Sequence, residues 1–374
     1  MKQGWEYKKL GDCTQILDSQ RKPVTKKDRT GGIYPYYGAT GIQDYVDKYI
    51  FDGRYVLVGE DGAKWSAFEQ SAFIIEGKSW VNNHAHVLKP HDFLVDTFLI
   101  YFLNYSDLDS YISGAIVRKL TQASLRNIEI PLPPKSTQLA IVSELDKINE
   151  LIRLKKEQLK DFDNLAQSIF YEMFGDPVEN EMGWEVKKLG DSIKVIGGYA
   201  FCSKNFLKSG IPVLRIGNIN TGKFTPTNMV YWQKDKGLSR YRILPGDLVI
   251  SLTGTVGKSD YGNVCILGND YEEYYLNQRN AKLEVGSNLN KYFLTYLLKQ
   301  DMIRKKLTGI NRGVRQANIA NRDIENLNIP LPPLPLQHLF AQRIEQIEHQ
   351  KAEVQKAIAD LETLLASRMQ YWFE

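Results

Sequence analysis

The feature that most constrains the fold is an internal repeat within the 374 residues of the chain. Gly4-Trp5-Glu6-Tyr7-Lys8-Lys9-Leu10-Gly11-Asp12 returns almost unchanged as Gly183-Trp184-Glu185-Val186-Lys187-Lys188-Leu189-Gly190-Asp191. Each copy is followed by a proline-rich hinge, residues 130–134 and residues 329–333, and each hinge precedes a long heptad pattern. Two copies of one unit predict two similar domains related by an approximate twofold axis. Such a protein suits a target made of two parts.

Apolar residues after each hinge recur in alternating steps of four and three. This spacing predicts two long helices, over residues 134–175 and 333–374, that pack on each other as an antiparallel coiled coil. The second seam repeats the first at an offset of 199. The alternative is an amphipathic helix that packs on its own domain, which would need a broader apolar stripe. The predicted seam consists of Ile141, Leu145, Ile148, Ile152, Leu159 and Phe162 in the first helix and Phe340, Ile344, Ile347, Val354, Ile358 and Leu361 in the second.

Lys155 and Lys351 each interrupt this seam once. A polar seam residue can fix the register of two helices at a cost in stability. Alternatively, the stem of each lysine covers apolar surface while its ammonium group reaches water. The second interpretation is preferred, and the sequence leaves both open.

The segments outside the helices, which we call the first head (residues 1–133) and the second head (residues 176–332), contain short β-type runs separated by glycine. Helical patterns over residues 94–103 and 290–299 make the predicted class α+β. The expected order is therefore head, helix, head, helix, with pseudo-twofold symmetry. The offset between matching residues grows from 179 to 199, so the second head has longer loops, where specificity usually resides.

The formal net charge of +4 is small for a nucleic-acid-binding protein, but it is unevenly distributed. Residues 136–174 contain five Lys or Arg and seven Asp or Glu, and residues 335–374 contain four and six. The rest of the chain therefore carries 39 basic and 31 acidic residues, a net charge of +8. A cationic surface attracts phosphates by releasing counterions, so this distribution modestly favours a nucleic-acid partner.

Several classes of protein are excluded. The sequence lacks an apolar run of the roughly 18 residues that a membrane span needs, and its first residues lack the apolar region of a signal peptide, so we expect a cytoplasmic protein with no membrane partner. The three cysteines are far apart and are expected to be reduced. His84, His86 and His91 are not expected to bind a metal ion, because alternate residues of a strand face opposite sides. We predict no metal site.

A matched block in the two heads exchanges its central polar residues. Asn82-Asn83-His84-Ala85-His86-Val87-Leu88 corresponds to Asn277-Gln278-Arg279-Asn280-Ala281-Lys282-Leu283 at an offset of 195. Asn, Gln and Arg side chains can pair bidentately with adenine or guanine edges. Two heads of one design with different polar sets would therefore read two different short sequences. The alternative is that these residues cap turns at the ends of strands.

A second polar patch precedes each hinge, in Arg118-Lys119-Leu120-Thr121-Gln122 and in Arg312-Gly313-Val314-Arg315-Gln316-Ala317-Asn318. Each patch mixes cations that can hold phosphates with amides that can read bases. Arg215 and Asn218, from an early strand of the second head, are weaker candidates, and core or turn roles compete there. The predicted DNA-contacting residues are Asn82, Asn83, His84, His86, Arg118, Lys119, Gln122, Arg215, Asn218, Lys258, Gln278, Arg279, Asn280, Arg312, Arg315 and Gln316.

Two short motifs resemble parts of enzyme sites but are incomplete. Gly257-Lys258-Ser259 ends like a phosphate-binding loop, yet that loop needs a glycine where the chain has Leu252, and the following residues predict turn and strand instead of a helix. Glu185 and Lys187 resemble half of a nuclease motif without its preceding Pro-Asp pair. The Asp-Pro-Pro-Tyr and Asn-Pro-Pro-Tyr tetrapeptides of amino-methyltransferases are also absent. The sequence therefore predicts no catalytic residues, and Lys258 is expected to contact phosphate.

Taken together, the motifs resemble the specificity subunits of type I restriction-modification systems. The resemblance covers essentially the whole chain. It implies that each head is a target recognition domain for double-stranded DNA and that the helices are spacers setting an unread gap between two half-sites. The motifs that carry it are the repeated opening, the Ile-Pro-Leu-Pro-Pro hinge, Tyr37-Gly38-Ala39-Thr40-Gly41-Ile42, Gly59-Glu60-Asp61-Gly62-Ala63, and Gly246-Asp247-Leu248 with Gly254.

The resemblance also implies the partners of the chain. The subunit would recruit two modification (methyltransferase) subunits and, where the system has them, two restriction subunits. S-adenosylmethionine, ATP and magnesium would bind those partners, with no cofactor in this chain. The subunit would direct adenine methylation and ATP-dependent cleavage without catalysing either reaction. Two alternatives stay open: a specificity subunit of another two-headed system, such as one with a fused nuclease and methyltransferase, and a scaffold that binds proteins instead of DNA.

Overall fold

The computed structural model describes residues 4–114, 116–309 and 316–374. The chain divides into two compact units, Met1–Glu157 with Gln355–Glu374, and Gln158–Val354. Each unit therefore contains one head and a part of each long helix. The fold is α+β, as predicted, and the three cysteines are unpaired. Among the described helices, none combines the length and the apolar character needed to cross a membrane.

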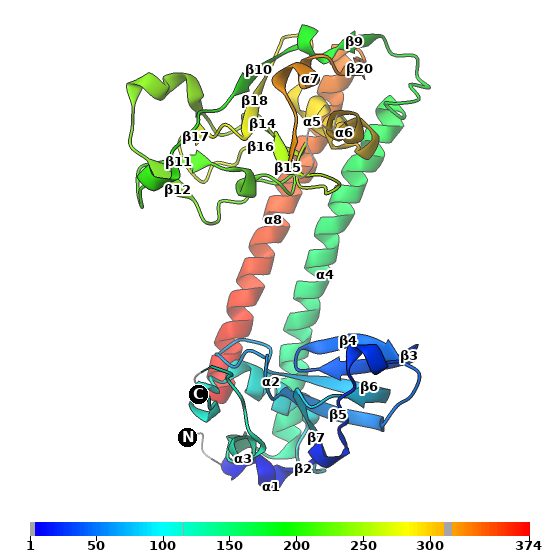
Figure 1. The fold of residues 1–374 in the computed structure, drawn as a ribbon, viewed down its shortest axis with the longest axis vertical. Coiled ribbons are helices and arrows are strands. Elements are labelled where there is room, and N and C mark those ends of the chain that lie inside the picture. Colours follow the sequence, from blue (N-terminus) through cyan, green and yellow to red (C-terminus); the bar gives the residue numbers. More distant parts are fainter. Residues whose placement is uncertain (1–3, 115, 310–315) are drawn as a thin grey trace. The chain divides into compact units, whose positions relative to one another are not determined.

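The first unit is built on a six-stranded sheet with the strand order β2-β7-β5-β6-β3-β4 (Figure 1). The apolar run Val56-Leu57-Val58 lies in β5, near the middle of this sheet, and all three residues are fully buried. Helix α2 packs against β5 and β6. The bounds are α1 (Leu10–Cys13), β2 (Thr14–Ile16), β3 (Gly31–Gly38), β4 (Gly41–Val46), β5 (Phe51–Gly59), β6 (Ala72–Val81), β7 (Ala85–Pro90), α2 (Asp96–Tyr105) and α3 (Gln122–Arg126).

The second unit contains two four-stranded sheets, ordered β10-β18-β14-β16 and β12-β11-β17-β13. The first has the same strand order as β2-β7-β5-β6 in the first unit. By sequence offset, β16 and β17 together match the single long strand β6, so the longer loops of the second head interrupt that strand and divide one sheet into two. The bounds are β10 (Ile193–Gly197), β11 (Ile211–Leu214), β12 (Val230–Trp232), β13 (Arg242–Ile243), β14 (Leu248–Ser251), β15 (Thr253–Thr255), β16 (Val264–Ile266), β17 (Tyr274–Leu276), β18 (Asn280–Val285), α5 (Lys291–Lys299), α6 (Asp301–Thr308), β19 (Gln316–Asn318) and α7 (Asn321–Glu325).

The repeated opening and the hinge pair with each other in both units. Strand β1 (Glu6–Lys9) is antiparallel to β8 (Glu129–Leu132), and β9 (Val186–Lys188) is antiparallel to β20 (Asn328–Pro330). Each head thus begins and ends in two neighbouring strands. This pairing explains why the opening and the hinge recur together, because each needs the other to satisfy its backbone hydrogen bonds.

The two heptad patterns form helices α4 (Lys135–Phe174) and α8 (Leu334–Phe373), each of 40 residues. In both units, α4 residues with higher residue numbers contact α8 residues with lower residue numbers. The helices are therefore antiparallel, as predicted. The contacts that show this are Glu144 with Arg368 and Lys156 with Glu362 in the first unit, and Asp163 with Lys351 and Phe170 with Phe340 in the second.

The predicted seam residues are all buried or partly buried, with Leu159, Phe162 and Leu361 the partly buried ones. Toward the hinges the same stripe also packs on the heads: Ile141 lies in one core with residues of the first head, and Phe340 in one core with residues of the second. The coiled-coil interpretation and the interpretation of a helix packed on its own head therefore apply to different parts of each helix.

A buried glutamine joins the start of each long helix to its head. The Gln138 Oε1 accepts a hydrogen bond from the Val95 amide, and the Gln337 Oε1 accepts one from the Asn290 amide, both at 2.8 Å. The side-chain amide of each glutamine donates to the carbonyl of a hinge proline, Pro133 or Pro332. Val95 and Asn290 are the N-cap residues of α2 and α5. The same contact in both repeats fixes the hinge relative to the small helix.

Candidate nucleic-acid interface

A tight turn occurs at the same place in both heads, between β6 and β7 in the first head and between β17 and β18 in the second. In the first turn, the Asn82 Oδ1 accepts a hydrogen bond from the His84 amide at 2.8 Å. In the second turn, the Asn277 Oδ1 accepts one from the Arg279 amide at 3.2 Å. An asparagine that bonds to the amide two residues later is a typical turn former. The matched block therefore forms a turn with the same backbone geometry in both heads.

The side chains exposed on these two turns differ between the heads. The first turn exposes Asn83 and His84, and the second exposes Gln278 and Arg279. His84 is paired with Asp61 through its Nδ1. The Gln278 and Arg279 side chains make no hydrogen bond or ion pair with another described residue. The heads thus present different polar groups on equivalent frames.

Four predicted contact residues are buried, which corrects their assignment. Asn82, His86, Asn218 and Asn280 are between 0% and 3% exposed. Each of these side chains makes at least one hydrogen bond inside its head, so it supports the frame instead of facing a target. For these four residues, the alternative of a turn or core role holds. The bonds of the last two run from Asn218 to Arg215, Thr225 and Thr227, and from Asn280 to Leu214.

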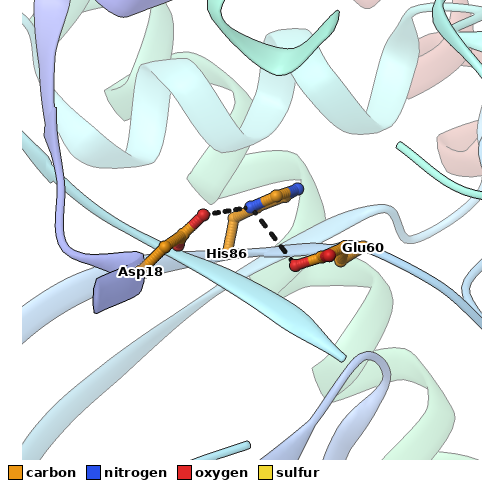
Figure 2. Close-up of side chains that lie close together, drawn as sticks. All are labelled: Asp18, Glu60 and His86. Atoms are coloured by element: carbon orange, nitrogen blue, oxygen red, sulfur yellow. Dashed lines mark hydrogen bonds and ion pairs between the residues drawn. The ribbon is translucent and has the colours of Figure 1, made fainter. Parts of the chain in front are cut away.

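His86 lies between two carboxylates in the first head. Figure 2 shows its ring between Asp18 and Glu60, with Nδ1 2.6 Å from the Asp18 Oδ2 and 3.6 Å from the Glu60 Oε2. The Nε2 of the same ring lies 2.8 Å from the Leu120 carbonyl oxygen. Both ring nitrogens face acceptors, so the doubly protonated imidazole is the form that donates to both. Burial acts to raise the pKa of the Asp18 carboxyl, but the hydrogen bonds and charge of its partners, His86 first, lower that pKa overall.

Two further cations complete this network. The Glu60 carboxylate lies 2.5 Å from the Arg21 Nη1 and 2.7 Å from the Lys119 Nζ. Asp18, Glu60 and His86 have ligand atoms within 4.8 Å of one another, a spacing that a metal ion could use. Protein cations already compensate both carboxylates, and an added divalent ion would meet their positive charge, so we assign no metal to this cluster. The second head lacks the central pair of this network, since Leu252 and Ala281 stand where the first head has Glu60 and His86.

The network brings together two segments that the sequence singled out separately. His86 belongs to the turn block, whereas Lys119 and Gln122 belong to the patch before the first hinge. The Gln122 side-chain amide donates to the Asp18 Oδ2 at 3.0 Å, beside the bond from His86. The Lys119 side chain remains 42% exposed despite its ion pair. The first head therefore presents the turn and the patch side by side.

In the second head, four predicted residues line one cavity of about 570 Å³. They are Arg215, Asn218, Gln278 and Arg279, and the lining contains no acidic residue. The Arg215 guanidinium donates to the Asn228 carbonyl at 2.5 Å, which holds that side chain against the wall. Asn277, which opens the matched block, also lines the cavity. Sequence reasoning missed the remaining lining residues, because no local pattern marks them. They are Phe201, Ser203, Phe206, Ile216, Gly217, Thr227 and Asn228.

The remaining predicted residues lie elsewhere. Arg118 pairs with Asp109 at 2.6 Å and is half exposed. Lys258 is exposed in a turn between β15 and β16, where no helix follows the Gly-Lys-Ser sequence. Arg312 and Arg315 lie outside the described residues, and Gln316 begins β19, where only its backbone is described.

The fold and the paired turns define a class of protein: a duplicated, two-headed molecule in which each α+β head leads into a long helix and presents its own polar surface. The chain belongs to the family of type I restriction-modification DNA specificity proteins, whose domain model matches residues 2–161 and 181–363. The two matches coincide with the two repeats. The resemblance inferred from the motifs is therefore confirmed.

Relatives from bacteria and archaea are similar over most of their length. The putative type I restriction enzyme specificity subunit S.HindORF215P of Haemophilus influenzae is 30% identical over 356 residues, which cover 92% of this chain and 87% of the relative. The MjaVIII specificity subunit of Methanocaldococcus jannaschii is 25% identical over 393 residues, covering 96% of this chain and 92% of that one.

Solved structures share the fold. The S subunit of a type I restriction-modification system from M. genitalium has a TM-score of 0.57 at 14% identity, covering 99% of this chain and 96% of that chain. A chain from a structure of type I complex assembly and conformational transition has a TM-score of 0.58 at 19% identity, covering 100% and 98%.

Proposed function

We propose that this chain is the DNA specificity subunit of a type I restriction-modification enzyme and that each head reads one half of a two-part target. The observation that carries the proposal is the pair of equivalent turns with different exposed side chains, Asn83 and His84 in one head and Gln278 and Arg279 in the other. Two related domains that recognise different DNA sequences need the same backbone frame with different polar side chains on it. Base edges differ in their pattern of donors and acceptors, so exchanged side chains change the sequence that is read.

Phosphate contacts place each head on the duplex in this proposal. The residues outside helices α4 and α8 carry a net charge of +6, and the described lining of the cavity in the second head contains two arginines and no acidic residue. Exposed cations such as Lys119 and Lys258 fit this role, because phosphate contacts fix register without carrying sequence information.

Helices α4 and α8 act as the spacer that sets the unread gap. A helix of 40 residues is about 60 Å long at 1.5 Å per residue, which exceeds the ~34–36 Å of one turn of B-DNA. The exposed faces of these helices also offer a surface for two modification subunits and, where the system has them, two restriction subunits. S-adenosylmethionine, ATP and magnesium bind those partners in this proposal, and this chain supplies targeting without catalysis.

The test is co-expression with a type I modification subunit from the same genome in a host without other DNA methylation, followed by sequencing of modified bases. The expected result is one two-part motif with methylated adenine in each half and a fixed gap. The matched control is the modification subunit alone. Methylation that is absent, scattered, or confined to one uninterrupted motif contradicts the proposal.

A further inference from the structure

The geometry points to Arg279 as the residue with which the second head reads a guanine in its half-site. This inference rests on the proposed function and deepens it, because it names the base class and the side chain. It is carried by the position of Arg279 on the turn, by the cavity beside it, and by the difference between the two heads.

The backbone of Arg279 is held from both sides. Its amide donates to the Asn277 Oδ1 at 3.2 Å, and its carbonyl oxygen accepts a hydrogen bond from the Leu252 amide at 2.8 Å. The matching residue of the first head, His84, is held in the same way, by Asn82 and by the Glu60 amide, both at 2.8 Å. A side chain on a fixed backbone loses less freedom on binding, which favours a specific contact.

Of the two arginines among the described lining residues, Arg279 is exposed, whereas Arg215 is partly buried. The Arg215 guanidinium is bonded to the Asn228 carbonyl, whereas the exposed Arg279 side chain has no hydrogen bond or ion pair with another described residue. The cavity of about 570 Å³ beside it holds no carboxylate that would compete for the guanidinium. The arginine fork matches the O6 and N7 acceptors of guanine in the major groove, the commonest specific contact between a protein and DNA.

The comparison of the heads favours a base over a phosphate as the target of Arg279. Phosphates are the same in both half-sites, so a phosphate contact gives no reason for two equivalent turns to carry different side chains. The first head carries His84 at this position, paired with Asp61, although the turn frame is equivalent. Exposed lysines of the second head, such as Lys204, Lys208 and Lys258, can supply point charges for phosphates.

The experiment measures methylation motifs for the complex carrying Arg279→Ala, Arg279→Lys or Arg279→His, beside the wild type. The expected result is that one guanine of the second half-site is no longer required, with discrimination there reduced roughly 5- to 150-fold, while the first half-site is unchanged. Arg279→Lys keeps the charge and loses the fork, so it should lose discrimination as well. Arg279→His places on the turn the residue that the first head already carries there, which guards against a variant that fails to fold.

Arg240→Ala is the matched control, because it removes an exposed arginine outside the cavity lining and should leave the motif unchanged. An unchanged motif in the Arg279 variants overturns the inference. A uniform loss of methylation at all sites also overturns the inference if the slope of log affinity for DNA against log salt concentration falls by about 1. That result would identify a phosphate contact. Loss of discrimination at a base other than guanine also overturns it. A wild-type complex without a two-part motif contradicts the proposed function instead, so the two failures are distinct.

Discussion

The ammonium group of Lys351 lies 2.9 Å from the Asp163 Oδ1 and so joins α8 to α4 within the second unit. A second carboxylate, Glu348, lies 2.8 Å from the same nitrogen, and the Lys351 side chain is only 10% exposed. The ammonium is therefore held by two carboxylates instead of reaching water by itself, which differs from the preferred expectation. Asp163 also accepts from the Lys223 ammonium at 2.9 Å. One carboxylate thus connects the helix pair to a loop of the second head.

Replacing Lys351 by alanine should destabilise the second unit by about 1–2 kcal/mol, because the change removes the buried cation between two carboxylates. The cost stays below that of a fully buried pair, since Asp163 is 43% exposed and keeps Lys223. Urea unfolding of the full chain measures the effect, with Lys356→Ala on the exposed face of α8 as the control. Equal stability of the two variants would show that the bridge contributes nothing.

The Glu60 network should make stability depend on pH. Burial acts to raise the pKa of the Glu60 carboxyl, but the hydrogen bonds and charges of its cationic partners, Lys119 first, lower it overall. A lowered folded-state pKa means that this stabilisation is present above the ordinary carboxyl pKa and is lost as pH falls through the folded-state value. Glu60→Gln should therefore cost about 2–3 kcal/mol at neutral pH and progressively less below about pH 4.

Urea unfolding at several pH values checks this dependence. The control is Glu76→Gln, which removes an exposed carboxylate 3.4 Å from Arg54 and should change stability little at any pH. A difference between wild type and Glu60→Gln that stays constant down to the lowest pH would contradict the assigned role of the carboxylate.

The two buried glutamines should contribute equally and independently. Gln138→Ala and Gln337→Ala each leave a partly buried amide and a buried proline carbonyl without their partner, which should cost about 1–3 kcal/mol. The double variant should show the sum of the two losses, because the two glutamines belong to different compact units of the chain. Thermal unfolding is the measurement, and Gln342→Ala on an exposed part of α8 is the control. A double variant no less stable than either single variant would disprove independence.

Lengthening both helices should lengthen the unread gap. Seven residues inserted after Leu151 and seven after Leu361 preserve the heptad seam and add about 10.5 Å, equivalent to roughly three base pairs at 3.4 Å each. Motifs determined by sequencing modified bases should then show the same half-sites with a longer gap. Seven polar residues inserted after the exposed Asn269, in a loop of the second head, serve as the control. An unchanged gap in the lengthened protein would rule out the spacer role.

The repeat, the seam and the antiparallel helices could be predicted, because segments such as the opening with Trp5 and Trp184 recur and the spacing of apolar residues is regular. The joint recurrence of opening and hinge is also compatible with their pairing, although the sequence alone does not specify which strands are neighbours. The turn frame formed by Asn82 and Asn277 appeared only as the less specific alternative, because a side chain that can read a base can also close a turn.

Other parts of the site were beyond sequence reasoning. Asp18, Glu60, His86 and Lys119 are separated by up to 101 residues, and no periodic pattern links them. The cavity of the second head joins Phe201 to Arg279 from elements far apart in the chain. His86 and Asn280 have the residue types of base readers, and only the burial of their side chains shows that they support the frame.

The pairing of β1 with β8 and of β9 with β20 has a consequence for how such proteins diversify. The polypeptide enters and leaves each head at adjacent points, so the material between those points can change in length or origin without displacing the ends. The opening and the hinge that bound each head also have nearly the same sequence in both repeats. Recombination between the repeats would therefore find matching sequences at both ends of a head. Under the proposed function, exchange of the segment between these paired strands replaces the reader of one half-site and leaves the helices unchanged.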